Sequence, residues 1–551
     1  MTAPVPSILW SVAGTDSGGG AGLSADLRAA DAFGAHLCPV VAAVTAQHSR
    51  AVTRIEAVAT EVLEAQMAAL ADDLPPRVIK TGLLGSVGNV LAVARQVDRL
   101  RAHGPVALVV DPVLAASTGA RFGDASLLQA IRDELLPRAT LVTPNRREAA
   151  ALLGTPPPSA SKPEAIDTIP EAASRLRALG AEAVCITGGD SIDARGHALD
   201  WIDSAQARGW LALPRIATPH NHGTGCTFAS SAAAALSIGF VSADAVILSK
   251  MATAHALRCG YVAGSGAGPV RARPGFAANP SLLPVMSWGT EPAFLATAAA
   301  PTRKLGLYAI VESAERVRQV LSAGVRTVQL RIKAPMNPDA GWHARLRDAV
   351  GASILACEAA DAELFVNDHW ELARALGAGG VHLGQEDLLA LGEQGRRSIQ
   401  ASGLALGISS HSLWELCRTR SLAPRYVACG PVWPTLTKSM PWRAQGLDNL
   451  AWWRRMAGAP VVAIGGILEP GQVRDVAACG VDGVCVVRAL GADPSATVPV
   501  LREALAQAAI VAERRESPTA PEPLPVGVKE ACDGPALASE AGFPELPHPT
   551  L

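Results

Sequence analysis

Residues 222–231 read HGTGCTFASS and run directly into the apolar stretch AAAALSIG. Two glycines at the start of a predicted helix expose successive backbone N–H groups, and the helix dipole adds to their attraction for an anion. Cys226 follows these glycines, where a helix N-terminus favours the thiolate. The stretch predicts an anion site beside a thiol, and a buried structural cysteine in a glycine turn is the alternative.

Short apolar runs alternate with Ala-rich helical stretches on the N-terminal side of this motif. This alternation predicts βα units built on a parallel sheet within residues 1–270. The runs are SILWSVAG (7–14), PVVAAVTA (39–46), PRVIKTGLL (76–84), PVALVVDPV (105–113), ATLVTPN (139–145) and AEAVCITGG (181–189).

A second block covers residues 303–512 and carries eight further strand candidates separated by helical segments. Eight such units in this length predict a TIM (β/α)8 barrel. Residues 271–302 have no sustained period and many breakers, so we expect a linker there. The tail, residues 513–551, holds eight prolines from position 517 onward and is predicted to be disordered.

Charge and cysteine content exclude several classes of protein. The chain has 48 Lys and Arg against 50 Asp and Glu, which gives no general attraction for nucleic acid or anionic membrane. The sequence contains no uninterrupted run of about 18 apolar residues, so no transmembrane helix is predicted. None of the ten cysteines forms a C-x-x-C pair, so a zinc ribbon or thioredoxin motif is unsupported and a reducing cytoplasm fits best.

Further polar groups of the first block follow predicted strands. Residues 14–22, GTDSGGGAG, connect the first strand to a helix and form either a ligand-binding glycine loop or a plain tight turn. Asp111 and Glu148 also follow strands, and ligands of open α/β sheets bind at these carboxyl ends. Carboxylates there can serve Mg²⁺, although a lone N-x-x-E is more often surface decoration.

Taken in order, these motifs resemble the ribokinase superfamily, most closely hydroxymethylpyrimidine/phosphomethylpyrimidine kinase. The resemblance implies a three-layer α/β/α fold, and ATP- and Mg²⁺-dependent phosphorylation of a pyrimidine alcohol and then of its monophosphate. It rests on GTDSGGGAGLSADL, VTAQHS, IKTGLLGS, DPVLAASTG, TPNRREAALL, ITGGD and HGTGCTFASS.

The same resemblance implies roles for individual residues. Cys226 would be the catalytic base, and the amides of Gly223, Thr224, Gly225 and Cys226 would form the anion hole. Gln47 would bind the aminopyrimidine, Gly14 and Asp26 would shape its pocket, Asp111 and Glu148 would serve Mg²⁺, and Lys250 would lie near the nucleotide. His48 and Asn221 depart from the family pattern, which expects Asn and Thr there.

Charged and amide side chains of the second block suit a metal-bound diphosphate. Gln329, Arg331 and Lys333 alternate along one predicted strand and so share a face. Asp368 ends the next strand and Asp387 follows the one after it, so the two carboxylates can hold a hard cation. The alternative for the charged strand residues is a solvated strand edge, and the alternative for each aspartate is a helix cap.

The second block resembles thiamine-phosphate synthase across about residues 305–490, and this family implies the barrel fold. The resemblance rests on LYAIVES, VQLRIK, VNDHWELARALGAGGVHLGQEDL, LGISSH, GPVWPTLTK, VVAIGGI and GVCVVRAL. It implies that diphosphate leaves first and that the thiazole nitrogen then adds to the pyrimidine methylene cation.

The family also implies the substrate contacts of this block. Gln329, Arg331, Lys333, Asn367 and Lys438 would bind the pyrimidine diphosphate, Asp368 and Asp387 would hold Mg²⁺, and Ser409 would contact the pyrimidine or its diphosphate. Thr435, Thr437, Gly466, Val487 and Arg488 would contact the thiazole phosphate, and Arg488 departs from an expected Ser.

Together the two blocks predict a bifunctional enzyme of thiamine biosynthesis that acts on small-molecule substrates. Two alternatives are a kinase for pyridoxal or another vitamin alcohol, and a sensor in which one block only binds thiamine intermediates. The sequence leaves open the oligomeric state, a homo-oligomer included, and channelling between the sites.

Overall fold

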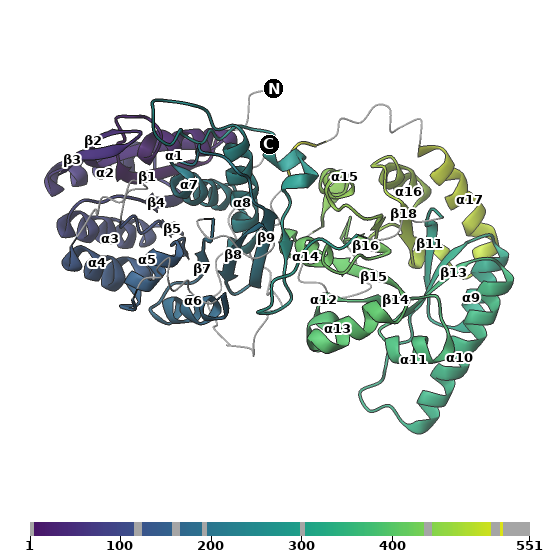
Figure 1. Cartoon of the computed structure of the whole chain (residues 1–551). Coiled ribbons are helices and arrows are strands. Elements are labelled where there is room, and N and C mark those ends of the chain that lie inside the picture. Colours follow the sequence, from purple (N-terminus) through teal and green to yellow (C-terminus); the bar gives the residue numbers. More distant parts are fainter. Residues whose placement is uncertain are drawn as a thin grey trace. The chain divides into compact units, whose positions relative to one another are not determined.

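The computed structural model describes residues 5–114, 124–156, 166–189, 196–297, 303–434, 444–508 and 518–521. The chain divides into two compact units, with the boundary between Ala293 and Phe294 (Figure 1). The predicted tail lies almost wholly outside the described residues.

The first unit is built on a ten-stranded mixed sheet with the order β10-β9-β8-β7-β6-β5-β4-β1-β2-β3. Its centre is parallel, whereas β3 and β8 to β10 pair antiparallel with their neighbours. The strands are β1 (Ile8–Gly14), β2 (His36–His48), β3 (Ala51–Ala57), β4 (Val78–Thr81), β5 (Ala107–Val110), β6 (Leu141–Val142), β7 (Val184–Ile186), β8 (His197–Asp203), β9 (Arg208–Pro214) and β10 (Val285–Met286).

Helices pack in two groups against this sheet. In one group α7 contacts α1 and α8 and lies over β1, β4 and β5, and in the other α2 packs on α3 and α5 on α6. The central strands are almost fully buried, as expected for parallel strands covered on both faces. The helices are α1 (Gly22–Ala32), α2 (Thr60–Asp73), α3 (Val87–Arg101), α4 (Ala125–Ala130), α5 (Arg146–Leu152), α6 (Ile169–Ala178), α7 (Thr224–Ser237) and α8 (Ser242–Arg258).

Residues 271–293 belong to the first unit, contrary to the predicted linker. Strand β10 pairs with β9, and the Ser287 hydroxyl accepts a 2.8 Å hydrogen bond from the Trp210 amide. The indole N–H of Trp210 donates to the Thr290 carbonyl at 2.7 Å. A two-residue strand and short 3-10 turns leave no period in the sequence, which is why the pattern predicted a linker.

The second unit is a closed barrel of eight parallel strands, as predicted. Each predicted apolar run of this block contains one strand. Consecutive strands pair with one another, and β11 pairs with β18 to close the ring. The strands are β11 (Gly306–Val311), β12 (Thr327–Leu330), β13 (Glu363–Asn367), β14 (Gly380–Leu383), β15 (Ala405–Ser410), β16 (Tyr426–Cys429), β17 (Val461–Ala463) and β18 (Gly483–Val486).

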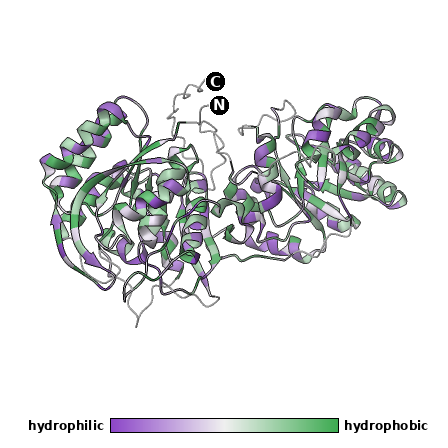
Figure 2. Cartoon of the chain, turned by 90° about the horizontal axis from the view of Figure 1, so that it is seen from above, coloured by the Kyte–Doolittle hydropathy of each residue, from purple (hydrophilic) through white to green (hydrophobic). Residues whose placement is uncertain are grey.

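Helices α9 to α17 follow the barrel strands. Apolar residues line the strands of both units, whereas the helices carry hydrophobic and hydrophilic residues side by side (Figure 2). The helices are α9 (Ala314–Ser322), α10 (Ala340–Ala359), α11 (Trp370–Leu376), α12 (Gln385–Ala390), α13 (Gly392–Ala401), α14 (Leu413–Thr419), α15 (Gly446–Met456), α16 (Pro470–Ala477) and α17 (Pro494–Ala506). Among the described residues no helix has the length and apolar character to span a membrane.

Candidate active sites

The centre of the first unit holds a buried ion pair between Lys80 of β4 and Asp26 of α1. The Lys80 Nζ lies 3.1 Å from each carboxylate oxygen of Asp26, and both side chains are inaccessible to solvent. Ser11 and Ser230 each donate a 2.7 Å hydrogen bond to the same carboxylate. These four hydrogen bonds engage both oxygens of Asp26, so the carboxylate anchors Lys80.

The Lys80 Nζ also lies 3.8 Å from the Asp111 Oδ2, and its charge acts on both Asp111 and Cys226. Burial raises the pKa of Cys226 to about 12, against an opposing effect of Lys80, while Asp26 and Asp111 raise it further. Burial also raises the pKa of Asp111 to about 6, again against Lys80. The helix N-terminus was expected to favour the Cys226 thiolate, but in this structure burial outweighs it.

The two glycine-rich loops are in contact around this thiol. Gly223 is the N-cap of α7 with φ +85°, and a Cβ there would lie 2.1 Å from the Gly20 carbonyl oxygen. A Cβ on Gly20 would lie 2.3 Å from the His222 ring, and the backbone of Gly22 lowers the pKa of Cys226. Both predicted loops thus form one cradle of backbone amides at the start of a 14-residue helix.

Asp16 fixes the shape of the first loop. Its carboxylate accepts hydrogen bonds from the amides of Gly18, Gly20 and Ala21, and it lies 2.8 Å from the His222 Nε2. Burial raises the pKa of Asp16, but the His222 hydrogen bond and the backbone amides outweigh burial and lower the pKa below its usual value. Gln47, which was predicted to bind the aminopyrimidine, lies 3.3 Å from the same imidazole nitrogen through its Nε2, so it stands beside the cradle.

Other predicted residues of this unit have structural partners. Glu148 and Asn145 form a reciprocal capping box at the start of α5. The Lys250 Nζ donates to Asp200 at 2.7 Å, and Asp200 also accepts from the Gly188 amide, so this buried pair braces the turn after β7. Gly14 ends β1, where a Cβ would lie 3.0 Å from Leu83.

The two departures from the family pattern lie at the rim. His48 is exposed at the end of β2. Asn221 is exposed and accepts a 2.5 Å hydrogen bond through its carbonyl from the Thr224 hydroxyl. Neither side chain belongs to the buried cluster around Lys80.

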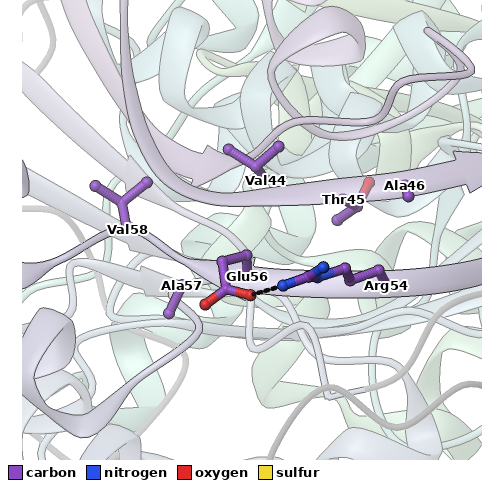
Figure 3. Close-up of a pocket in the computed structure, with 7 residues that line it drawn as sticks. All are labelled: Val44, Thr45, Ala46, Arg54, Glu56, Ala57 and Val58. Carbon is purple, nitrogen blue, oxygen red and sulfur yellow. Dashed lines mark hydrogen bonds and ion pairs between the residues drawn. The ribbon is translucent and has the colours of Figure 1, made fainter.

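A hollow of about 400 Å³ lies elsewhere, on the β2–β3 hairpin (Figure 3). The exposed pair of Arg54 and Glu56, 3.1 Å apart, lines it together with Val44 and Ala57. This hollow contains neither the glycine loops nor Cys226, so we do not assign the kinase chemistry to it.

In the second unit, predicted site residues from several strands gather at the carboxyl end of the barrel. Gln329 and Asn367 lie near the ends of β12 and β13, and the Gln329 amide donates to the Asn367 oxygen at 2.6 Å. Ser409 lies near the end of β15. Strand β12 ends at Leu330, so Arg331 and the exposed Lys333 stand on the following loop, two and four positions beyond Gln329, and not on the strand.

Asp368 and Asp387 follow neighbouring strands, β13 and β14. Asp368 is exposed, has φ +66°, and its amide donates to the His382 carbonyl. One oxygen of Asp387 accepts from the Gly384 amide at 2.9 Å, which leaves the other for a ligand. A left-handed backbone at a strand end is costly for most residues and is frequent at functional sites.

Glycines after β17 allow a close approach of the loop that begins at Gly430. Gly465 and Gly466 have φ of +92° and +73°, and a Cβ on Gly466 would lie 2.6 Å from Trp433. Val487 and the exposed Arg488 follow β18, the next strand of the ring. Thr435, Thr437 and Lys438 lie outside the described residues.

Sequence reasoning missed Lys80 and Asp16 in the first unit. A lysine inside the apolar run VIKT is the available signal, because a charge in a buried strand requires a partner. It also missed Tyr308, Tyr426 and His382 in the barrel interior, where Tyr426 hydrogen bonds to both of the others. These three lie in strands that read as hydrophobic.

Comparisons with known proteins agree with this division. The family model described as phosphomethylpyrimidine kinase matches residues 16–271, and that described as thiamine monophosphate synthase matches residues 307–490. A rice protein named probable thiamine biosynthetic bifunctional enzyme is 33% identical over 505 residues, which cover 89% of this chain and 87% of the relative.

Separate relatives match each unit. A hydroxymethylpyrimidine/phosphomethylpyrimidine kinase of Synechococcus elongatus is 38% identical over 263 residues, covering 48% of this chain and 96% of the relative. A thiamine-phosphate synthase of Neisseria meningitidis is 43% identical over 197 residues, covering 35% of this chain and 91% of the relative.

Proposed function

The chain belongs to the family of bifunctional thiamine biosynthetic enzymes, and from that premise we propose which of its residues carry each reaction. Its first unit phosphorylates 4-amino-5-hydroxymethyl-2-methylpyrimidine and then the monophosphate, with ATP as phosphoryl donor. Its second unit joins the resulting diphosphate to thiazole phosphate, which gives thiamine phosphate and free diphosphate. The cradle of amides around Cys226 is the observation that carries the kinase assignment.

In the kinase unit, Cys226 takes the proton of the attacking hydroxyl, and the amides of Gly223, Thr224 and Gly225 hold the transferring phosphate. Burial keeps the Cys226 thiol largely protonated at neutral pH, but phosphoryl transfer depends mainly on position and charge stabilisation, so a small thiolate fraction suffices. Gln47 binds the pyrimidine beside the cradle, and Gly14 closes the base of the pocket.

The donor set of the kinase unit fits Mg²⁺. The Thr143 Oγ1 is buried without a hydrogen-bond partner among the described residues, and the buried Asp111 Oδ2, at the end of the neighbouring strand, lies 3.8 Å from the Lys80 Nζ. Hard oxygen donors of this kind suit Mg²⁺, which would neutralise phosphate charge when bound. We assign Asp111 as a ligand of the ion and Glu148 as a residue that lies near the ion without binding it directly. Lys250 braces the turn after β7, near the nucleotide.

In the synthase unit, Gln329, Arg331, Lys333 and Asn367, with Lys438, bind the pyrimidine diphosphate. Asp368 and Asp387 hold the Mg²⁺ that this leaving group requires, since carboxylates and diphosphate oxygens are its preferred ligands. The reaction needs stabilisation of the departing diphosphate more than a general base. Ser409 contacts the pyrimidine.

The thiazole phosphate binds after β17 and β18 in this proposal. Many barrels place a phosphate there. Gly466 and Val487 offer backbone amides, and Arg488 offers a guanidinium where the family pattern has a hydroxyl. Thr435 and Thr437 complete the contacts. We also propose a cytoplasmic location, because none of the nine described cysteines takes part in a disulfide.

One assay tests the whole proposal. Purified protein receives hydroxymethylpyrimidine, ATP, Mg²⁺ and thiazole phosphate, and thiamine phosphate is measured by chromatography. Omission of ATP stops the reaction, and added pyrimidine diphosphate restores it. If the kinase unit turns over pyridoxal faster than the pyrimidine alcohol, the substrate assignment of that unit is wrong.

A further inference from the structure

Six side chains form a continuous hydrogen-bonded chain across the interior of the barrel. The Gln329 Nε2 lies 2.6 Å from the Asn367 Oδ1, and the Gln329 Oε1 lies 3.2 Å from the Tyr308 hydroxyl. Tyr308 and Tyr426 are 2.6 Å apart through their hydroxyls. His382 lies 2.8 Å from Tyr426 through Nδ1 and 2.8 Å from the Ser409 hydroxyl through Nε2.

Every internal member of this chain is buried. Tyr308, Tyr426 and Gln329 are at most 3% exposed, and His382 is 7% exposed. Gly407 makes room for the chain, because a Cβ there would lie 2.3 Å from the Tyr426 ring. Buried polar groups must be paired, so these bonds cannot be exchanged for water without cost.

The chain has a direction, because each phenol has a single proton. Tyr308 donates to the Gln329 Oε1, so its oxygen must accept from Tyr426. Tyr426 has then used its proton, so it accepts from the His382 Nδ1–H. Burial raises the pKa of both phenols well above the usual value, which keeps both protons in place.

This direction decides what the two ends offer a ligand. The imidazole tautomer with its proton on Nδ1 has an accepting Nε2, so the Ser409 hydroxyl donates inward and presents its oxygen as an acceptor. At the other end the Asn367 oxygen accepts from Gln329, so its NH₂ group remains to donate outward. A donor suits an anionic diphosphate, and an acceptor suits a ring amino group.

We propose that Tyr308, Tyr426 and His382 are positioning residues that hold Ser409 as a hydrogen-bond acceptor, and that they thereby select a heterocycle with an amino group over one with an oxo group. This inference rests on the proposed synthase function for the identity of the substrate. The orientation of the hydrogen bonds is a property of the protein alone.

Removal of the Tyr308 hydroxyl, which lies far from Ser409 along the chain, allows the donors and acceptors of the remaining hydrogen bonds to reverse. In Tyr308→Phe the Tyr426 proton loses its acceptor and can turn to the His382 Nδ1. His382 then takes the Nε2–H tautomer and donates to Ser409, whose own proton becomes available to a ligand. Ser409 can then pair with an oxo group, so we expect the amino-to-oxo preference to fall about tenfold.

Two measurements on the full chain test the inference. Nitrogen-15 NMR of histidine-labelled protein reports the tautomer of His382, with its signals assigned by their loss in His382→Gln. Inhibition of the synthase by the amino and the 4-oxo pyrimidine monophosphates, without ATP, reports the preference. Phe365→Leu is the matched control, because Phe365 packs against both tyrosine rings without joining the chain.

The outcomes separate the inference from the function on which it rests. An Nδ1–H tautomer in the wild type and in Phe365→Leu, with Nε2–H and a weaker amino preference in Tyr308→Phe, supports it. An Nε2–H tautomer in the wild type overturns it even if the synthase is fully active. No synthase turnover in a wild type with the Nδ1–H tautomer refutes the function and leaves the direction of the chain standing. An unchanged preference in Tyr308→Phe refutes selection by Ser409.

Discussion

Gly20 and Gly223 lie so close that a Cβ on Gly223 would stand 2.1 Å from the Gly20 carbonyl oxygen. This contact joins two loops that are far apart in the sequence, and it brings the amide cradle to Cys226. Gly223 is required for two reasons: there is no room for a Cβ, and its φ of +85° favours glycine.

Gly223→Ala is expected to abolish pyrimidine phosphorylation and to leave the synthase active. The added methyl group collides with backbone, which cannot swing away as a flexible side chain would, so the two loops must separate. Turnover of hydroxymethylpyrimidine with ATP measures the loss, which we expect to exceed about 100-fold, as for removal of an anion-hole donor. Gly104→Ala is the control, because a Cβ there meets no atom within 4 Å.

Cys226→Ala is expected to abolish the kinase reaction without affecting the synthase, because the proton acceptor is lost. A positioned general base contributes about 100- to 10,000-fold. Burial raises the pKa of Cys226 to about 12, so the thiolate share of the wild type grows with each pH unit through the neutral range. Kinase turnover should therefore rise from pH 6.5 to 9. Full activity of the variant removes Cys226 from the mechanism.

Local patterns were enough to predict the glycine-rich start of α7 and the barrel. Glycines before an Ala-rich helix mark residues 222–231, and eight apolar runs mark the eight strands, because these signals lie within a few neighbouring residues. The partner of Lys80 could not be predicted in this way. Asp26 lies 54 positions away on α1, and the pairing of β4 with β1, the strand that precedes α1, brings the two residues together.

The polar interior of the barrel shows the same limit. Tyr308 and Tyr426 stand in apolar strands 118 positions apart, and each reads alone as a core residue. Closure of the ring turns both inward toward Gln329 and His382. A local pattern reports which face of a strand is buried, but the partner on the opposite wall depends on the closed barrel.

Asp111→Asn is expected to stabilise the first unit at pH 8 while it abolishes kinase activity. Burial raises the folded-state pKa of Asp111 from 3.8 to about 6, so its ionisation disfavours the folded state. The stability that the protonated carboxyl provides is present below pH 4 and is lost as pH rises through 6. The substitution should recover up to about 3 kcal/mol at pH 8 and nothing at pH 4.

Calorimetric unfolding at both pH values checks this expectation for Asp111. Asp72→Asn provides the comparison, since Asp72 is an exposed carboxylate on α2. Equal stabilisation of Asp111→Asn at pH 4 and pH 8 would contradict the proposed cost of the buried charge. If Asp111 is retained for metal binding at a cost in stability, Asp111→Asn should be more stable than the wild type but inactive.

Asp368→Asn is expected to lower synthase turnover by about 100-fold or more and to leave the kinase unchanged. Asparagine tolerates the φ of +66° at this position, so the backbone is kept and only the charge is lost. A neutral amide binds Mg²⁺ more weakly than a carboxylate does, so raised Mg²⁺ should restore part of the turnover. Asp361→Asn is a close control, because Asp361 also has a positive φ, of 49°, but precedes β13 instead of following it. Thiamine phosphate formation from supplied pyrimidine diphosphate measures both variants, and near-normal turnover of Asp368→Asn at limiting Mg²⁺ would remove Asp368 from the metal site.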